Sequence, residues 1–295
     1  MLLPVARAET TTPSSAVPAA AVALPVRLDF GDWAAPLNAA LRASARVATS
    51  SPVRLTVITP EPRHSTEVSL HVSSNSDTSQ MRVDIWSDLV CPWCYVGKRR
   101  FEKALACFDR RDEVQIVHRS FQLNPAAPRD RTSNRREMLM QKYRRSLAQA
   151  TKMDARMTQT AAAEGLEFHL EGTGTGNTFD AHQLVHLAHA QGMQDAVIER
   201  FYRAYFTEQR SLFDAGSLVD LAAEAGLDRD DAAATLDDNR YAEAVREDIE
   251  IARQLGVNGV PFFVIDDRYG ISGAQGPNTF LDVLQRVAAD HHSVG

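Results

Sequence analysis

The chain has 295 residues, of which 44% are hydrophobic and 24% are charged, as is typical of a soluble globular protein. Its formal net charge of -6 argues against a nucleic-acid partner, because phosphate binding requires a basic surface. No stretch approaches the roughly 20 consecutive apolar residues of a membrane span, so no membrane partner is expected. Three cysteines are too few for a disulfide framework. With no secretory signal recognisable near the start, they favour a cytoplasmic protein.

Residues 1–80 differ in composition from the rest of the chain. They hold eight of the 13 prolines and eleven serines, with no lysine and no cysteine. Such a segment buries too little apolar surface to offset the entropy of ordering, so we predict a disordered extension. Within it, residues 53–58 have the character of a short strand that could pair locally. The composition also fits a gene start placed upstream of the true one, which would be Met81.

From residue 81 the pattern changes to regular elements. Residues 83–86 form a β-prone run, 91–110 a helix with apolar residues at three- to five-residue spacing, and 114–121 a second strand. Asparagine and prolines then mark a turn at 124–128. This order is the strand–helix–strand unit of α/β folds.

The middle of the chain is predicted to be helical, and the C-terminal part returns to strands. A glycine-rich loop at 172–176 interrupts the helices. Residues 262–266 and 269–272 form a predicted hairpin, and Pro277 begins a final helix that runs to about residue 289. The predicted helices of the middle region are 134–164, 177–191, 194–208, 217–225, 230–238 and 241–255.

Cys91 and Cys94, separated by Pro92 and Trp93, stand at the predicted start of a helix. At this spacing the two thiols can close a small disulfide ring, and Pro92 suits the first helical turn because it has no N–H. The positive end of the helix dipole would lower the pKa of Cys91 by about 1.5 from near 8.5, so Cys91 is the predicted nucleophile. Cys94, deeper in the helix, is the predicted resolving thiol. Since Trp93 carries no charge, thiolate stabilisation must come from the helix end, and the basic residues 98–100 are expected on a solvated face.

Other readings of these residues are a zinc half-site, a static disulfide or two buried thiols. The remaining cysteine, Cys107, is predicted to be a buried free thiol off the face of the pair. His182, His186 and His189 have a spacing that metal ligands can adopt, but no carboxylate or cysteine cluster accompanies them, so no metal site is predicted. Asp84 and Asp88 flank the motif, and a carboxylate near the pair could shuttle protons, although a turn-forming role is favoured for Asp88.

Residues 84–97 (DIWSDLVCPWCYVG) closely resemble the active-site segment of FrnE-type proteins, in the DsbA-like branch of the thioredoxin superfamily. The resemblance covers about residues 81–290 and implies a thioredoxin-like α/β fold for a domain at 81–295. An all-helical insertion at about 126–256 would separate its βαβ and ββα halves. Further matching motifs follow in chain order at 121–125 (FQLNP), 177–182 (NTFDAH), 259–263 (GVPFF) and 271–275 (ISGAQ).

The resemblance also implies roles for residues outside the cysteine motif. Val260 and Pro261 would form a cis peptide that faces the cysteine pair and offers its backbone to the substrate. The helical insertion would cover the site, with Phe121, Asn124 and His182 lining the cleft.

The function implied is a DsbA-like protein disulfide oxidoreductase or isomerase that exchanges disulfides through Cys91 and Cys94. Its expected partners are thiol- or disulfide-containing proteins or small thiols. No cofactor is expected, glutathione is a candidate redox partner, and monomer and homodimer both stay open. One alternative is a glutathione-dependent kappa-class transferase or 2-hydroxychromene-2-carboxylate isomerase, which shares the fold but usually has serine where Cys91 stands. Another is a redox-regulated, chaperone-like binding module.

Overall fold

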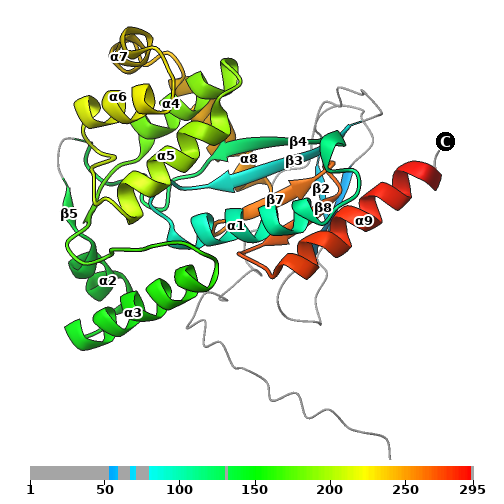
Figure 1. Ribbon diagram of the computed structural model, residues 1–295, viewed down its shortest axis with the longest axis horizontal. Helices are drawn as coiled ribbons and strands as arrows, with labels where there is room; N and C mark the ends of the chain where they lie inside the picture. Colours follow the sequence, from blue (N-terminus) through cyan, green and yellow to red (C-terminus); the bar gives the residue numbers. More distant parts are fainter. Residues whose placement is uncertain (1–52, 59–66, 71–79, 130–131, 294–295) are drawn as a thin grey trace, which may run out of the picture. The chain divides into compact units, whose positions relative to one another are not determined.

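The computed structural model of the protein describes residues 53–58, 67–70, 80–129 and 132–293 (Figure 1). It has a mixed α/β architecture with a thioredoxin-like core and a helical insertion, which confirms the predicted fold class. Within these residues no helix combines the length and the apolar character needed to cross a bilayer.

The βαβ half of the core is β3 (Met81–Ser87), α1 (Pro92–Ala106), the short helix η1 (Arg111–Glu113) and β4 (Val114–Ser120). Strands β3 and β4 pair in parallel from Met81↔Val114 to Ser87↔Ser120. The other half follows the insertion and consists of β7 (Phe262–Ile265), β8 (Tyr269–Ser272) and α9 (Pro277–Ser293). Because β7 runs antiparallel to β3, the ends of β3 and β4 and the start of β7 meet at one edge of the sheet.

Alternating side chains divide the sheet into two covered faces. Val83 and Ile85 pack with Phe101 of α1 and Phe280 of α9, so these two helices lie side by side on one face (Figure 1). Trp86 points to the opposite face, where it packs with Ala252 of α8 (Ala242–Gln254). The period-two pattern of the strands therefore buries the sheet between the core helices and a helix of the insertion.

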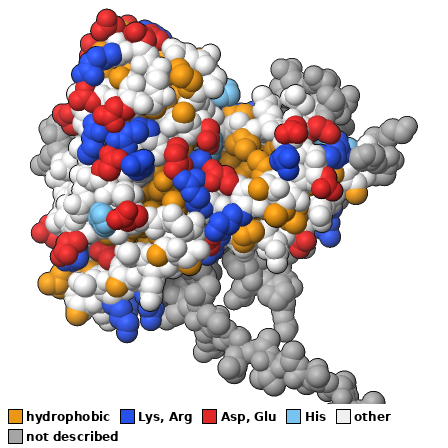
Figure 2. Space-filling model, in the orientation of Figure 1, with side chains coloured by type: hydrophobic (Ala, Val, Ile, Leu, Met, Phe, Trp, Pro, Cys, Tyr) orange, Lys and Arg blue, Asp and Glu red, His pale blue; other side chains and the backbone are white. Residues whose placement is uncertain are grey.

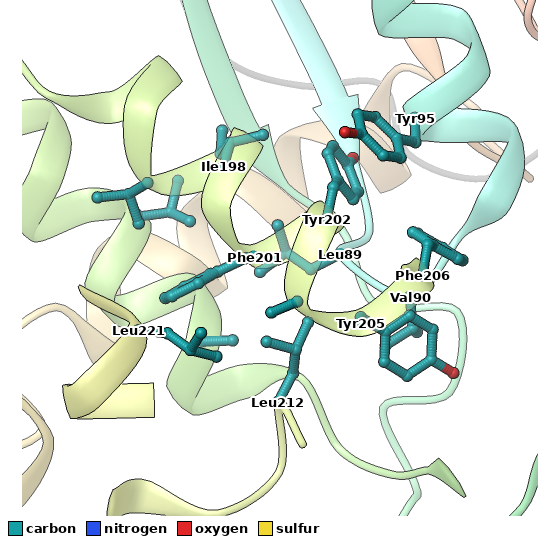
Figure 3. Close-up of a cluster of buried hydrophobic side chains, with 14 of the residues drawn as sticks. Leu89, Val90, Tyr95, Ile198, Phe201, Tyr202, Tyr205, Phe206, Leu212 and Leu221 are labelled. Atoms are coloured by element: carbon teal, nitrogen blue, oxygen red, sulfur yellow. The ribbon is translucent and has the colours of Figure 1, made fainter. Parts of the chain in front are cut away.

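The insertion contributes its own hydrophobic core, and this core is continuous with the cysteine turn. Leu89, Val90 and Tyr95 belong to the same buried cluster as Phe201 and Tyr202 (Figure 3). The insertion is therefore packed directly onto the segment that carries the cysteines. Its other helices are α2 (Arg135–Tyr143), α3 (Leu147–Ala163), α4 (Phe179–Ala190), α5 (Gln194–Phe206), α6 (Ala215–Glu224) and α7 (Arg229–Asp237).

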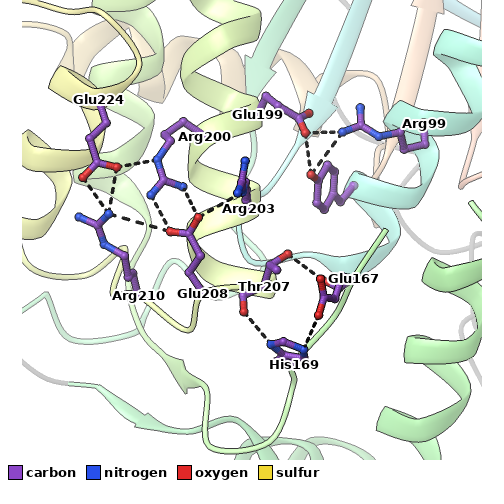
Figure 4. Close-up of polar contacts among 11 residues, drawn as sticks. Arg99, Glu167, His169, Glu199, Arg200, Arg203, Thr207, Glu208, Arg210 and Glu224 are labelled. Atoms are coloured by element: carbon purple, nitrogen blue, oxygen red, sulfur yellow. Dashed lines mark hydrogen bonds and ion pairs between the residues drawn. The ribbon is translucent and has the colours of Figure 1, made fainter. Parts of the chain in front are cut away.

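Acidic and basic side chains are interspersed over the insertion on the face shown in Figure 2. Several of them are paired. Arg200 donates to Glu208 and Glu224, and Arg210 donates to Glu224 (Figure 4). Such exposed pairs fix side-chain positions and contribute little stability each.

The single helix predicted at 134–164 is two helices, α2 and α3. Arg144 has a left-handed backbone with φ of 49° and ends α2. Ser146 then caps α3 in a reciprocal capping box with Gln149. The expected loop at 172–176 also contains a strand, β6 (Gly174–Thr175), which pairs with β5 (Ser133–Asn134).

The prediction of disorder through residue 80 does not hold for two segments. One is β1 (Val53–Ile58), the segment with predicted strand character, and the other is β2 (Glu67–Leu70). β1 pairs in parallel with β8 and antiparallel with β2. These pairings extend the sheet to the order β2-β1-β8-β7-β3-β4. They satisfy the backbone groups of β8, which would otherwise be an edge strand. The rest of residues 1–79 lies outside the described part of the chain, so the origin of this extension stays a prediction.

Candidate active site

Cys91 and Cys94 lie at the start of α1, at the sheet edge where the strand ends meet. Cys91 is the N-cap residue, with φ of -89° and ψ of 111°, and its carbonyl accepts from the Cys94 N–H at 3.0 Å. Pro92 occupies the first helical position, where a missing N–H costs nothing. Both cysteines are free thiols and both are buried, with 4% and 2% of their surface exposed.

The Cys91 sulfur faces the loop that precedes β7. Its thiol lies 3.5 Å from the carbonyl oxygen of Val260, to which it donates. The Val260–Pro261 peptide bond is cis, as the resemblance implied. A Cβ on Gly97 of α1 would lie 2.8 Å from Cγ of Pro261, so only glycine lets this loop rest on the helix.

Cys94 is set deeper than its partner. Burial raises the pKa of Cys94 well above the ordinary thiol range, and the hydrogen bond with Cys91 and the charge of Cys91 act in the same direction. A backbone hydrogen bond from Asp88 opposes them but is outweighed. Cys94 is therefore a protonated thiol at neutral pH, which fits the predicted resolving role.

Two tyrosines of the insertion complete the surroundings of the pair. Tyr202 of α5 stacks on Tyr95 at 4.7 Å between ring centroids, and burial followed by the charge of Cys94 raises its pKa. Tyr143 of α2 is half-buried, and burial followed by the charge of Cys91 raises its pKa. Sequence reasoning missed both residues, because nothing in their own helices marks them as neighbours of a motif so far away in the chain.

The predicted cleft residues belong to one group of contacts. His182 is buried with 2% exposure, and its Nε2 lies 3.0 Å from the carbonyl oxygen of Phe121. The Leu123 N–H donates to Asp88 at 2.7 Å, and Asn124 is exposed. His182 thus lies behind the segment that begins at Phe121 and supports it, while Asn124 is at the rim.

Two histidines and Cys107 remain among the candidates from the sequence. His186 bonds to Asp248 at 3.0 Å, and His189 is exposed. In the described part of the chain, no group of three or more His, Cys, Asp or Glu residues could hold a metal ion. Cys107 is exposed, contrary to the prediction, because α1 ends at Ala106, short of the expected residue 110.

The basic residues after the motif connect α1 to the insertion and do not form a solvated face. Lys98 is buried, with its Nζ 2.9 Å from Asp195 of α5. Arg99 and the Tyr95 hydroxyl both donate to Glu199 of α5 (Figure 4). The charges that sequence reasoning placed in solvent therefore fix the cysteine helix to α5.

Comparisons with known proteins bear on the fold that carries this site. The family model of the DSBA-like thioredoxin domain matches residues 82–285. The crystal structure of a probable DsbA oxidoreductase from Streptomyces coelicolor is 47% identical, covers 71% of this chain and 91% of its own, and has a TM-score of 0.69. The uncharacterized protein YwbO of Bacillus subtilis (strain 168) is 24% identical over 204 residues, which are 68% of this chain and 94% of YwbO.

Two further structures share the fold at lower identity. A 2-hydroxychromene-2-carboxylate isomerase is 19% identical, covers 72% of this chain and 99% of its own, and has a TM-score of 0.53. The cytosolic disulfide reductase DsbM of Pseudomonas aeruginosa is 18% identical, covers 70% and 98%, and has a TM-score of 0.52.

Proposed function

The chain belongs to the DSBA-like thioredoxin domain family, and from this premise we propose that it is a dithiol–disulfide oxidoreductase in which Cys91 attacks and Cys94 resolves. The observation that carries the proposal is the unequal setting of the two thiols. Cys91 caps a helix and lies against the Val260 carbonyl, where a substrate strand could pair with the loop backbone. Cys94 is enclosed and keeps its proton.

In the oxidising direction, a substrate thiolate attacks the Cys91 sulfur of the Cys91–Cys94 disulfide. Cys94 leaves as a thiolate and takes up a proton, and a mixed disulfide joins the substrate to Cys91. A second substrate thiolate attacks the substrate sulfur of that bond, so the oxidised substrate departs and Cys91 is released as a thiolate. The reducing direction runs through the same steps in reverse.

We extend the proposal to the substrates, the redox partner, the FrnE-type group and the cellular location. Proteins or small molecules with thiols or disulfides are the substrates, with Val260, Pro261, Phe121 and Asn124 forming the surface that holds them. Glutathione is the proposed small redox partner; DsbM, a protein of the same fold, has a structure with glutathione. The assignment to the FrnE-type group and a cytoplasmic location rest on the motif and on the small number of cysteines.

The two alternatives share the fold and differ from the proposal in what they require of the cysteine pair. A kappa-class transferase or 2-hydroxychromene-2-carboxylate isomerase would not need a cysteine pair. A chaperone-like module would not need the pair to cycle. The presence of two adjacent thiols at the start of α1 favours the oxidoreductase.

Dithiol-driven reduction of insulin tests the proposal. We expect Cys91→Ser to lose activity by at least roughly 100-fold, because Cys94 is buried and Cys107 lies outside the site. Cys94→Ser should accumulate a mixed disulfide that reducing conditions release. Cys107→Ser, which removes an exposed cysteine outside the site, should behave as the wild type. Retained activity in Cys91→Ser, or glutathione conjugation by the wild type, would contradict the proposal.

A further inference from the structure

Arg100 of α1 connects two parts of the protein that are far apart in the sequence. Its Nε donates at 2.6 Å to Glu164, the residue that ends α3 in the insertion. Its Nη1 donates at 2.7 Å to the carbonyl oxygen of Ala274, which follows β8. The Arg100 side chain is 22% exposed and that of Glu164 is 11%, so the contact is largely removed from solvent.

Ala274 lies in a turn that is bonded directly to the loop at the cysteine pair. The N–H of its neighbour Gly273 donates to the Pro261 carbonyl oxygen at 2.8 Å. Gly273 has a φ of 79°, a left-handed conformation that glycine adopts without strain. A guanidinium that holds the Ala274 carbonyl therefore also restrains the backbone of Pro261.

The restrained loop is the one that faces the nucleophile. Val260, just before Pro261, accepts from the Cys91 thiol at 3.5 Å. A Cβ added to Gly97 would lie 2.8 Å from the Pro261 ring and 3.4 Å from the Ala274 side chain, so loop and turn rest together on α1. One helix thus carries the reactive sulfur and the guanidinium that holds the backbone opposite it.

The chemistry of arginine suits this position. A guanidinium has five N–H donors in a fixed plane, so one side chain can bond to a carboxylate and to a carbonyl at the same time. Lys103 also bonds to Glu164, at 2.7 Å, but its side chain is 47% exposed. Desolvation offsets much of the attraction in a partly buried ion pair, so the pair of Arg100 and Glu164 fixes a geometry more than it adds stability.

We infer that Arg100 is a positioning residue for substrate binding, which fixes the loop of Val260 and Pro261 where an extended peptide pairs with it, and that Glu164 orients the guanidinium. The inference rests on the proposed function, in which the substrate strand uses this loop. Main-chain hydrogen bonds supply affinity when a peptide adds to a fixed backbone, and a loose backbone loses that affinity. Polypeptide substrates should therefore depend on Arg100, whereas small disulfides that have no strand to pair should not.

Two substrates of different kind test this dependence, in a Cys107→Ser background. Insulin offers a polypeptide beside its disulfides, whereas dithiobis(nitrobenzoate) has no backbone. We expect Arg100→Gln to raise the KM for insulin about 10-fold with kcat within about twofold, because uniform binding is lost. The rate at which Cys91 reacts with dithiobis(nitrobenzoate) should stay within about twofold. An unchanged KM, or equal slowing with both substrates, would overturn the inference.

Lys103→Gln is the matched control, since it removes the other cation at Glu164 and leaves the bond to Ala274 in place. Both reactions should stay within about twofold of the parent. Arg100→Lys keeps the charge but has one nitrogen for two partners, so the KM for insulin should rise about threefold. If Arg100→Gln fails to fold, an unchanged KM in Arg100→Lys counts against the inference in its place.

Hydrogen exchange at Gly273 gives a readout that needs no activity. Its N–H is bonded to the Pro261 carbonyl, so its exchange reports how firmly the loop is held. In Arg100→Lys this amide should exchange about 10-fold faster than in the parent, and in Lys103→Gln it should exchange at the parental rate. Parental exchange in Arg100→Lys would contradict the inference. If the proposed function itself is wrong, the parent and Cys91→Ser will reduce insulin equally, whatever the exchange shows, which separates the two failures.

Discussion

At the scale of single residues, the site depends on two identical side chains in unlike surroundings. Cys91 caps a helix beside a loop carbonyl, whereas Cys94 is one turn further in and enclosed by the insertion. Two residues of the same type thereby differ in thiol chemistry, as the proposed function requires of an attacking and a resolving cysteine.

This difference predicts the reactivity of Cys94 in a Cys91→Ser, Cys107→Ser protein. Because burial is the first cause of its raised pKa, the shift should persist without the Cys91 sulfur. Alkylation by iodoacetamide, followed by mass spectrometry, should show a pH midpoint above about 8.5, the value of a free thiol. A midpoint at or below that of an unfolded control would contradict it. The folded state also holds this proton more tightly, so stability should fall as pH rises past about 8.5.

The sequence could reveal this pair and its loop, but only part of what surrounds them. The Cys-x-x-Cys spacing and the start of the helix are local signals, and the helix does begin at Pro92. Tyr143 and Tyr202 come from distant helices whose own patterns are ordinary, so their proximity depends on tertiary packing. The sequence predicts that Lys98 is a surface residue. It is buried in the structure because α5 supplies carboxylates that pair with it.

At the scale of elements, α1 is confined between the Pro261 loop and the insertion. Gly97 carries the contact with Pro261, and Arg100 donates to the Ala274 carbonyl at 2.7 Å and to Glu164 at 2.6 Å. The position of the cysteines therefore follows from contacts on both sides of the helix.

Gly97→Ala should displace this arrangement. The new methyl would meet the Pro261 ring at 2.8 Å and the Ala274 side chain at 3.4 Å. Overpacking of this kind costs about 1–3 kcal/mol, which outweighs a gain of about 1 kcal/mol in helix propensity. Urea unfolding should report a net loss, and insulin reduction should slow. Gly259→Ala is the control, because no atom lies within 4 Å of its added Cβ. Equal effects of the two substitutions would show that the contact is unimportant.

Element order and most boundaries could be predicted from periodicity, and the exceptions have identifiable causes. The break between α2 and α3 had a signal, Ser146 with Gln149 three residues later, but the surrounding helix-forming residues obscured it. The pairing of β1 with β8 had no local signal, because sheet addition depends on an edge that only the folded core provides.

At the scale of the whole molecule, Asp248 of α8 joins the insertion to the sheet. It is 1% exposed and accepts from Arg119 at 3.0 Å, the Ser120 N–H at 2.8 Å and His186 at 3.0 Å. Its backbone carbonyl accepts from the Trp86 indole, 162 positions away in the chain. Burial alone would raise the pKa of Asp248, but the hydrogen bonds from His186 and Ser120 and the charge of Arg119 lower it.

Asp248→Asn should destabilise the protein by about 3 kcal/mol at neutral pH, because the donors around it lose a buried anion. A lowered pKa means that the carboxylate stabilises the fold above its unfolded pKa of about 3.9, and that this contribution is lost as pH falls further. The difference between wild type and variant in urea unfolding should therefore shrink below about pH 4. Glu250→Gln, an exposed substitution on the same helix, should leave the unfolding midpoint unchanged. A pH-independent difference would contradict this account.

The pairing of β3 with β7 has a consequence for synthesis of the chain. β3 lies between β4 and β7, yet the whole insertion is translated before β7 leaves the ribosome. Contacts of such high sequence separation form slowly, so a nascent chain holds β3 with one neighbour missing while the remainder is made. During that interval Cys91 has no Val260 beside it, so the cysteine turn is made long before the loop that it faces.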